Sequence, residues 1–334
     1  MKKPLIMTSK RKALRLFTAS TLLLAVLLSG CEKKPSPVLP PEVSTSTAPQ
    51  KRIYSVIESA IECVRENPVS GTSSKVSYSY EKSNAFYYTL SEKQKALYDE
   101  MLPKAKDMTP FEYTAKNDGY DVMDNVLIAS TALCRDYPDL DNYFYIKEIF
   151  DGDMTTALQA SYFLPYDPEA APSSDVNKIK NEIDIFEEEC DLIVSAIPED
   201  FGTYDKYRYL AAIISLTTSY DNASSGAKSA ATAYGAIECG LSICQGYASC
   251  FEYLCQKADL WCKQVTGVSQ DTAHVWNLVK LESGTYHVDV TWADDDKNTP
   301  LDSGWQSYFM LTQDEILTDH EIDDGTVATG ERIF

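Results

Sequence analysis

The chain has 334 residues and a formal net charge of −20, because 50 acidic side chains outnumber 30 basic ones. A field of this sign repels the phosphates of nucleic acids and therefore excludes enzymes that act on DNA or RNA. Apolar residues make up 44% of the chain, which is enough to bury a sizeable core and excludes disorder throughout.

The first thirty residues have the layout of a secretory signal. Six basic residues precede an apolar run over residues 16–28, and no acidic residue occurs before Glu32. The run is about a dozen residues long, which is short for a membrane span. It ends in Leu28-Ser29-Gly30-Cys31, which resembles the lipobox at which bacterial lipoprotein precursors are lipidated and cleaved. We therefore expect a signal peptide over residues 1–30 and a lipid on Cys31.

A lipid on Cys31 would anchor the protein to a bacterial membrane on the extracytoplasmic side. An uncleaved signal would hold it on the same side. Residues 31–50 contain five prolines among small and polar residues, a composition that favours extended backbone and cannot bury a core. We interpret residues 31–50 as a tether between the membrane and the folded region.

Residues 51–197 are predicted to form a mainly helical N-terminal region, and they carry no recognisable catalytic motif. Ser91 and Gln94 have the spacing of a capping box, and apolar residues follow at helical intervals, which predicts a helix over about 91–106. A second helix is expected from about residue 122 to near Pro138.

Two further elements are expected in the same region. The segments 145–150 and 154–164 flank Asp151-Gly152, a pair typical of the tight turn of a β-hairpin. Apolar residues recur at steps of three and four over residues 176–197, which predicts an amphipathic helix that Pro198 ends. Aromatic clusters at 86–88 and 143–145 suit a groove for a peptide or glycan, but core packing is the better interpretation.

Cys244 stands where another helix is expected to begin, because residues 247–261 are apolar at helical spacing. The unpaired backbone N–H groups and the positive dipole end of a helix N-terminus favour thiolate over thiol, and the thiolate is the nucleophilic form. The same N–H groups can stabilise an oxyanion. We therefore expect the backbone N–H of Cys244, rather than the side chain of Gln245, to be the oxyanion donor.

A cysteine nucleophile needs a base and a group that orients the base. His274 begins an alternating apolar stretch, and residues 286–292 are interpreted as the returning strand. If Ser283-Gly284 forms a two-residue turn, His274 shares a face with Asp289 but is displaced from it by about four residues. Contact would then need a longer loop, a bulge or strong twist, and the sequence leaves this register open.

Three motifs in order resemble the bacterial transglutaminase-like superfamily: Cys-Gln-Gly-Tyr-Ala at 244–248, His-x-Trp-Asn at 274–277 and Val-Asp-Val-Thr-Trp at 288–292. The resemblance covers roughly residues 204–320. It implies a papain-like triad in which Cys244 is the nucleophile, His274 the general base and acid, and Asp289 the orienting carboxylate. It also implies an α+β fold for residues 198–334, with helices packed on a small antiparallel sheet.

The resemblance implies acyl transfer through a thioester on Cys244, with a protein or peptide amide as substrate, such as a cell-wall peptide. Transfer to water makes a peptidase or amidase, and transfer to an amine makes a cross-linking transglutaminase. We favour hydrolysis because water is abundant at the cell surface, whereas transfer to an amine requires a site that excludes it. The alternative is a catalytically inactive surface binding module on the same fold. No cofactor is expected.

Other residues near the triad have alternative interpretations. His287 lies two residues from Asp289 on the same expected face and is the alternative base, whereas His320 is expected to be structural or near the rim of the site. Cysteines crowd this region, but without a Cys-x-x-Cys pair we expect no metal site. A hydrolase that binds a metal through the three histidines remains a third class, which bound zinc would reveal.

The pairing of the cysteines stays open. Setting aside Cys31 and Cys244 leaves an odd number of cysteines, so at least one is not in an intramolecular disulfide. Within the helix expected from residue 244 onward, Cys255 and Cys262 would lie on one stripe but about 10 Å apart, so we expect that they cannot bridge each other.

Overall fold

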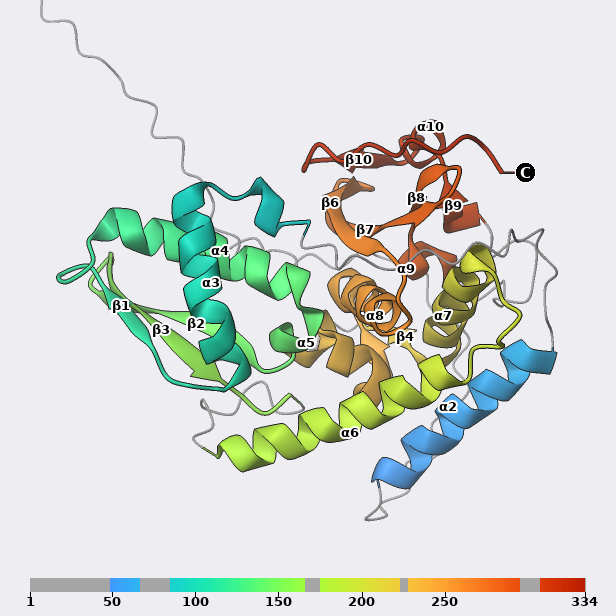
Figure 1. Ribbon diagram of the computed structural model, residues 1–334, viewed down its shortest axis with the longest axis horizontal. Coiled ribbons are helices and arrows are strands. Elements are labelled where there is room, and N and C mark those ends of the chain that lie inside the picture. Colours follow the sequence, from blue (N-terminus) through green and yellow to red (C-terminus); the bar gives the residue numbers. More distant parts are fainter. Residues whose placement is uncertain (1–48, 67–84, 166–174, 223–227, 295–306, 334) are drawn as a thin grey trace, which may run out of the picture.

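The computed structural model describes residues 49–66, 85–165, 175–222, 228–294 and 307–333 (Figure 1). In the described part of the chain, helices and strands pack around two large hydrophobic cores and a smaller cluster that contains Trp276 and Ile316, and the architecture is α+β, as expected. The predicted signal peptide and nearly all of the predicted tether lie outside the described residues. The first described helix, α2, spans Pro49–Glu66. Among the described residues, no helix has both the length and the apolar character needed to cross a membrane.

The first core lies between two helices and a three-stranded antiparallel sheet of order β1-β3-β2 (Figure 1). Ser91 caps the N-terminus of α3, where its side chain and that of Gln94 form a complete capping box. This confirms the first predicted helix. The predicted hairpin is also confirmed, with Asp151 opposite Met154. The elements are η1 (Tyr87–Thr89), α3 (Glu92–Lys106), β1 (Glu112–Thr114), α4 (Tyr120–Asp136), α5 (Pro138–Asp141), β2 (Phe144–Asp151) and β3 (Met154–Tyr162).

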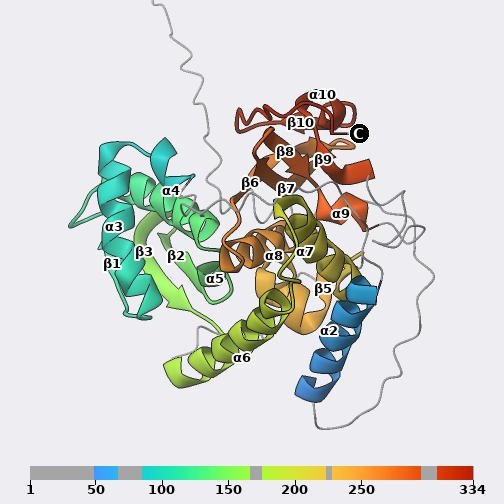
Figure 2. The ribbon, with the colours of Figure 1, turned by 45° about the vertical axis from the view of Figure 1, so that its right-hand side comes forward.

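The second core lies between a helical layer and a five-stranded antiparallel sheet of order β10-β6-β7-β8-β9. Figures 1 and 2 show α8 between this sheet and α6, and both elements contact α8. The helices are α6 (Val176–Ser195), α7 (Thr203–Thr217), α8 (Cys244–Lys257), α9 (Val290–Ala293) and α10 (Gln313–Ile316), with short turns of helix at η2 (Lys228–Ala231) and η3 (Gly235–Cys239). The strands are β4 (Ser219–Tyr220), β5 (Leu241–Ser242), β6 (Cys262–Ser269), β7 (Thr272–Leu281), β8 (Gly284–Val288), β9 (Phe309–Leu311) and β10 (His320–Ile322).

The second core draws on segments from both ends of the described chain. Helix α6 ends shortly before Pro198, as predicted, and its residues Phe186, Cys190 and Ile193 are buried in the same cluster as α7 and α8. Helix α2 contributes Ile57 to that cluster and packs on α7. The predicted boundary between residues 197 and 198 therefore separates segments that pack on one another.

The register of β7 and β8 answers the question that the sequence left open. Leu281 lies opposite Gly284, so the two-residue turn is Glu282-Ser283, one residue earlier than Ser283-Gly284. Because Asn277 lies opposite Val288, the ladder continued by one step places position 289 opposite position 276. Asp289 is thus displaced from His274 by about two residues, half the displacement that a turn at 283–284 would give. Diagonal neighbours of this kind lie within reach of long side chains, without a bulge or a longer loop.

Candidate active site

Cys244 is the first residue of α8, in the position expected from the sequence, and it is 2% exposed. Ile243 precedes it in extended conformation and provides no side-chain cap. The positive end of the helix dipole therefore lies at Cys244, where it favours negative charge. The backbone N–H groups of Gly246 and Tyr247 already donate to the Ile243 carbonyl oxygen, at 3.0 and 3.1 Å. A Cβ at Gly246 would lie 2.6 Å from the carbonyl oxygen of Ala230 and 2.9 Å from that of Thr232. Only glycine lets this turn pack so closely on the segment before it.

Two buried amides hold the start of α8 on the sheet. Asn277 Nδ2 on β7 donates to the carbonyl oxygen of Ala248 at 3.0 Å. Gln245 Nε2 donates to Gln264 Oε1 on β6 at 2.9 Å and to Ser249 Oγ at 3.1 Å. The side chain of Gln245 is thus occupied by the sheet and by its own helix. The backbone N–H of Cys244 therefore remains the better candidate for the oxyanion donor.

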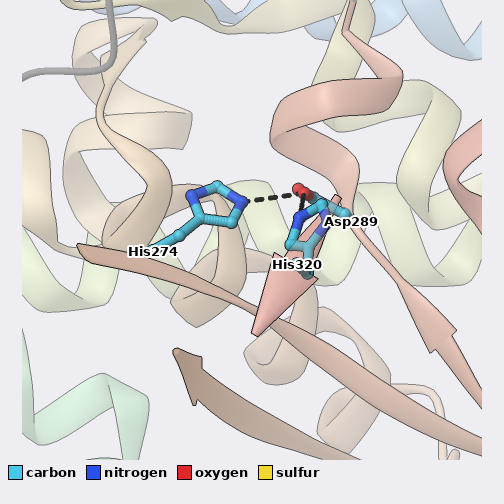
Figure 3. Close-up of side chains that lie close together, drawn as sticks. All are labelled: His274, Asp289 and His320. Carbon is cyan, nitrogen blue, oxygen red and sulfur yellow. Dashed lines mark hydrogen bonds and ion pairs between the residues drawn. The ribbon is translucent and has the colours of Figure 1, made fainter. Parts of the chain in front are cut away.

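His274 on β7 and Asp289 form a buried hydrogen-bonded pair, shown in Figure 3, with 2.7 Å between His274 Nε2 and Asp289 Oδ2. Strand β8 ends at Val288, and Asp289 caps the short helix α9, where its Oδ1 accepts the Trp292 backbone N–H at 3.1 Å. An ionised carboxylate can only accept hydrogen bonds. The proton of a neutral His274 ring therefore lies on Nε2, which leaves Nδ1 as the basic nitrogen.

His320 on β10 is the third member of this cluster, and the sequence did not predict its role. Its Nε2 lies 3.1 Å from Asp289 Oδ2, the same oxygen that contacts His274 (Figure 3). Its Nδ1 lies 2.6 Å from Asp319 Oδ1. Gly267 allows β10 to pair closely with β6, because a Cβ there would lie 1.8 Å from the Glu321 carbonyl oxygen. His320 is thus buried inside the cluster and not at its rim, so of the two expected positions for this residue only the structural one fits.

The two histidines set the charge of Asp289. Burial by itself would raise the pKa of this carboxyl, but the charges and hydrogen bonds of His274 and His320 outweigh it, and the pKa lies well below its ordinary value. Asp289 is therefore ionised at neutral pH, with donors on both oxygens. A carboxylate held in this way can orient an imidazole and stabilise its protonated form.

Residues 195–292 match the family model of the transglutaminase-like superfamily. The chain contains a transglutaminase-like domain. The matched segment includes Cys244, His274 and Asp289 but ends before His320. The match confirms the predicted transglutaminase-like superfamily, which is one of papain-like cysteine enzymes. No curated protein matches the chain.

The sequence offered His287 as an alternative base for the transglutaminase-like domain, but both of its ring nitrogens have other partners. Trp276 Nε1 donates to His287 Nδ1 at 3.0 Å, and His287 Nε2 lies 3.2 Å from Gln313 Oε1. Burial is the main cause that lowers the pKa of His287 to about 4. This histidine is thus neutral near pH 7, and its lone pair is used by Trp276. It serves to position the motif tryptophan rather than to accept a proton.

His274, Asp289 and His320 are also a group that could hold a metal ion, since one atom from each lies within 4.8 Å of the others. Two ligand atoms at 2.0–2.1 Å from a tetrahedral zinc ion are about 3.3 Å apart. The two Nε2 atoms lie only 2.7 Å and 3.1 Å from Asp289 Oδ2, which are hydrogen-bond distances. The arrangement therefore fits a chain of hydrogen bonds better than a metal centre.

Cys255 and Cys262 are close neighbours, contrary to the prediction from a continuous helix. Helix α8 ends at Lys257, the chain turns back, and Cys262 begins β6. The two thiols are hydrogen-bonded to each other. Burial raises the pKa of both thiols. They are therefore poor nucleophiles compared with a thiol at a helix N-terminus.

Proposed function

We propose that this protein is a cysteine acyl-transfer enzyme in which Cys244 is the nucleophile, His274 the base and acid, and Asp289 the orienting carboxylate. The observation that carries the proposal is the buried pair of His274 Nε2 and Asp289 Oδ2 at 2.7 Å, on a strand that packs against the helix begun by Cys244. A histidine fixed in this tautomer offers Nδ1 as a base, and a cysteine at a helix N-terminus offers a stabilised thiolate.

The reaction would begin when the Cys244 thiol gives its proton to His274 Nδ1. The thiolate attacks an amide carbonyl carbon, and the oxyanion that forms is stabilised by N–H groups at the start of α8. The C–N bond then breaks, His274 returns the proton to the departing amine, and a thioester remains on Cys244. Water or a second amine attacks the thioester, loses a proton to His274 and releases the thiol.

We propose a peptide or protein amide as the substrate, including peptides of the cell wall, and hydrolysis in preference to cross-linking. Water is abundant at a cell surface, and no second substrate has to bind before it can act. Cys31 and the segment before it lie outside the described residues. Their resemblance to a lipobox supports an extracytoplasmic enzyme held at a bacterial membrane by a lipid.

The test is the rate at which iodoacetamide alkylates Cys244 in the whole folded chain as a function of pH, followed by peptide mass mapping. Cys250 is the internal control, because it lies on the same helix, is 1% exposed and has a pKa that burial raises well above its ordinary value. We expect Cys244 to react far faster than Cys250 near pH 7. His274→Ala should remove most of this difference, since the thiolate loses its partner.

Equal slow rates at Cys244 and Cys250 would contradict the proposal and support the inactive binding module instead. If Cys244 is reactive, peptide amides are then offered with and without a primary amine. Release of free acid alone supports a peptidase or amidase, whereas an amine-linked product contradicts the preference for hydrolysis.

A further inference from the structure

Four titratable side chains form one continuous chain of hydrogen-bond contacts that extends beyond the proposed triad. In order they are His274, Asp289, His320 and Asp319, with successive distances of 2.7, 3.1 and 2.6 Å. The chain alternates imidazole and carboxylate groups. Its far end is fixed by Tyr308, whose hydroxyl donates to Asp319 Oδ2 at 2.7 Å. Burial raises the pKa of Tyr308, so this hydroxyl stays a donor.

The hydrogen-bond partners of the His320 ring favour its doubly protonated form. A neutral imidazole has one N–H donor and one acceptor nitrogen, whereas both neighbours of His320 are carboxylates. Ionised carboxylates only accept, so both contacts are favourable hydrogen bonds only when both ring nitrogens carry protons. Such a ring is a cation held between two anions. His287 differs, because its partners are the indole N–H of Trp276 and the amide oxygen of Gln313, which suit a neutral ring.

We propose that His320 is a positioning residue of the acyl-transfer site. It holds Asp289 Oδ2, the oxygen that His274 also contacts, and it places a second positive charge beside this carboxylate. The inference rests on the proposed function and adds a residue that lies outside the matched segment. His320 does not touch the reacting atoms. It acts through Asp289, whose Oδ2 it shares with His274.

A second cation on Asp289 would weaken the hold of that carboxylate on the protonated His274 ring. The ring centroids of His274 and His320 are 5.3 Å apart. The ionisable groups that face His320 are Asp289 before α9, His274 on β7, His287 on β8, Tyr308 before β9 and its own neighbour Asp319. Since His274 must return its proton to the departing amine, a cation beside Asp289 helps to prevent it from retaining that proton.

The experiment compares alkylation of Cys244 by iodoacetate, an anion, with alkylation by neutral iodoacetamide over a range of pH in the whole chain. The protonated His274 ring attracts iodoacetate. The ratio of the iodoacetate rate to the iodoacetamide rate therefore falls at the pH where His274 loses its proton. In His320→Gln, the amide can still donate to Asp289 but carries no charge. We expect this fall to move to higher pH by about two units, from the separation of the two rings at an effective dielectric of about 20.

His320→Ala removes the donor as well as the charge. We expect a further loss of Cys244 reactivity, up to about 100-fold, because Asp289 is then held less firmly. Asp319→Asn should move the fall in the ratio in the same direction as His320→Gln, by a smaller amount. His287→Gln is the control for the loss of a buried imidazole without the loss of a charge, because burial lowers the pKa of His287 to about 4 and its ring bonds do not involve Asp289. It should move the pH of the fall much less than His320→Gln does.

An unchanged pH in His320→Gln, with a reactive wild-type Cys244, would overturn this inference and leave the proposed function standing. An unreactive wild-type Cys244 would overturn both. Stoichiometric zinc that is lost in His320→Gln would also overturn the inference, because it would make His320 a metal ligand. The ¹⁵N shifts of the His320 ring give an independent measurement, and a neutral ring at pH 7 would contradict the proposal.

Discussion

The two cores each contain a fully buried aspartate, and the partners of these two carboxylates differ in kind. In the first core, Asp136 accepts the backbone N–H groups of Phe86 and Tyr87 and the hydroxyl of Tyr98. In the second core, Asp289 accepts from two imidazoles and one backbone N–H. The partners of Asp136 keep their protons throughout the physiological range, whereas an imidazole can exchange one.

The comparison shows that burial of a carboxylate does not by itself mark a catalytic site. The carboxylate of Asp136 joins η1, α3 and α4, and its hydrogen bonds hold those elements together. Its backbone carbonyl oxygen, which the carboxylate does not involve, accepts Gln256 Nε2 of α8 at 3.3 Å. Asp289 also joins several elements, but two of its partners can change charge during a reaction. The chemistry of the donors, rather than the depth of the acid, distinguishes a structural carboxylate from one that can orient a base.

The largest expected effect comes from replacing each aspartate by asparagine. Asp289→Asn keeps the shape of the side chain but removes the charge and turns one acceptor into a donor, which favours the wrong tautomer of His274. We expect kcat/KM, measured with an amide substrate, to fall by about 10⁴-fold. Asp136→Asn should lower the free energy of unfolding by about 1–3 kcal/mol, because one N–H or O–H loses its acceptor. It should leave the reactivity of Cys244 unchanged.

The two variants are measured for both properties, with denaturant unfolding for stability and alkylation for the site. A loss of Cys244 reactivity in a folded Asp136→Asn protein would contradict the purely structural role assigned to the Asp136 carboxylate. Full reactivity and turnover in Asp289→Asn would contradict the role of Asp289.

An effect smaller than the loss of turnover in Asp289→Asn is expected from the contribution of His287 to the stability of the protein. His287 is a buried histidine whose ring partners, Trp276 and Gln313, are uncharged, and Trp276 belongs to the smaller hydrophobic cluster. The pKa of His287 is about 4 in the folded protein and about 6.5 in an unfolded chain. Between these values the unfolded chain binds a proton that the folded protein does not, so stability falls as the pH is lowered from about 6.5 to 4. The full difference corresponds to about 3 kcal/mol. The His287→Gln variant should lack this loss of stability at low pH. The measurement is the difference in the free energy of unfolding between the wild type and the variant, from denaturant unfolding at each pH.

A wild-type protein and a His287→Gln variant that lose stability equally between pH 6.5 and pH 4 would contradict this account. Comparison of the two proteins is needed because other buried acids titrate in the same range. For example, burial raises the pKa of Asp141 to about 7. The folded protein then binds a proton that the unfolded chain does not, so the stability from Asp141 is lost as the pH rises, opposite to the effect of His287.

The sequence predicts those parts of the site that depend on local pattern. Cys244 at a helix start follows from helical spacing, and the shared face of His274 and Asp289 follows from the alternation of strands. Their contact did not follow, because a turn one residue earlier changes the displacement between strands by two residues. Loop geometry of this kind is not written in the hydrophobic pattern.

His320 escaped prediction for a different physical reason. It lies 31 residues after Asp289, on a three-residue strand whose pairing with β6 depends on the close approach at Gly267. A short strand at the edge of a sheet carries little periodic signal. The contact between Cys255 and Cys262 was missed because the helix ends between them, and helical spacing alone did not show that end. Long-range partners thus needed the structure, whereas the local motifs did not.

The smallest expected effect is at Ser91, and it tests whether a local weakness in the first core stays local. Ser91 caps α3 through Gln94, and the Ser91→Ala variant leaves an N–H at the start of that helix without its acceptor. We expect the free energy of unfolding to fall by about 1 kcal/mol. The alkylation rate of Cys244 should not change, because Ser91 contributes to neither α8 nor the five-stranded sheet. A changed alkylation rate at Cys244 would show that a change in the first core reaches the site in the second. The roles of Asp136 and Asp289 could then not be separated by their partners alone.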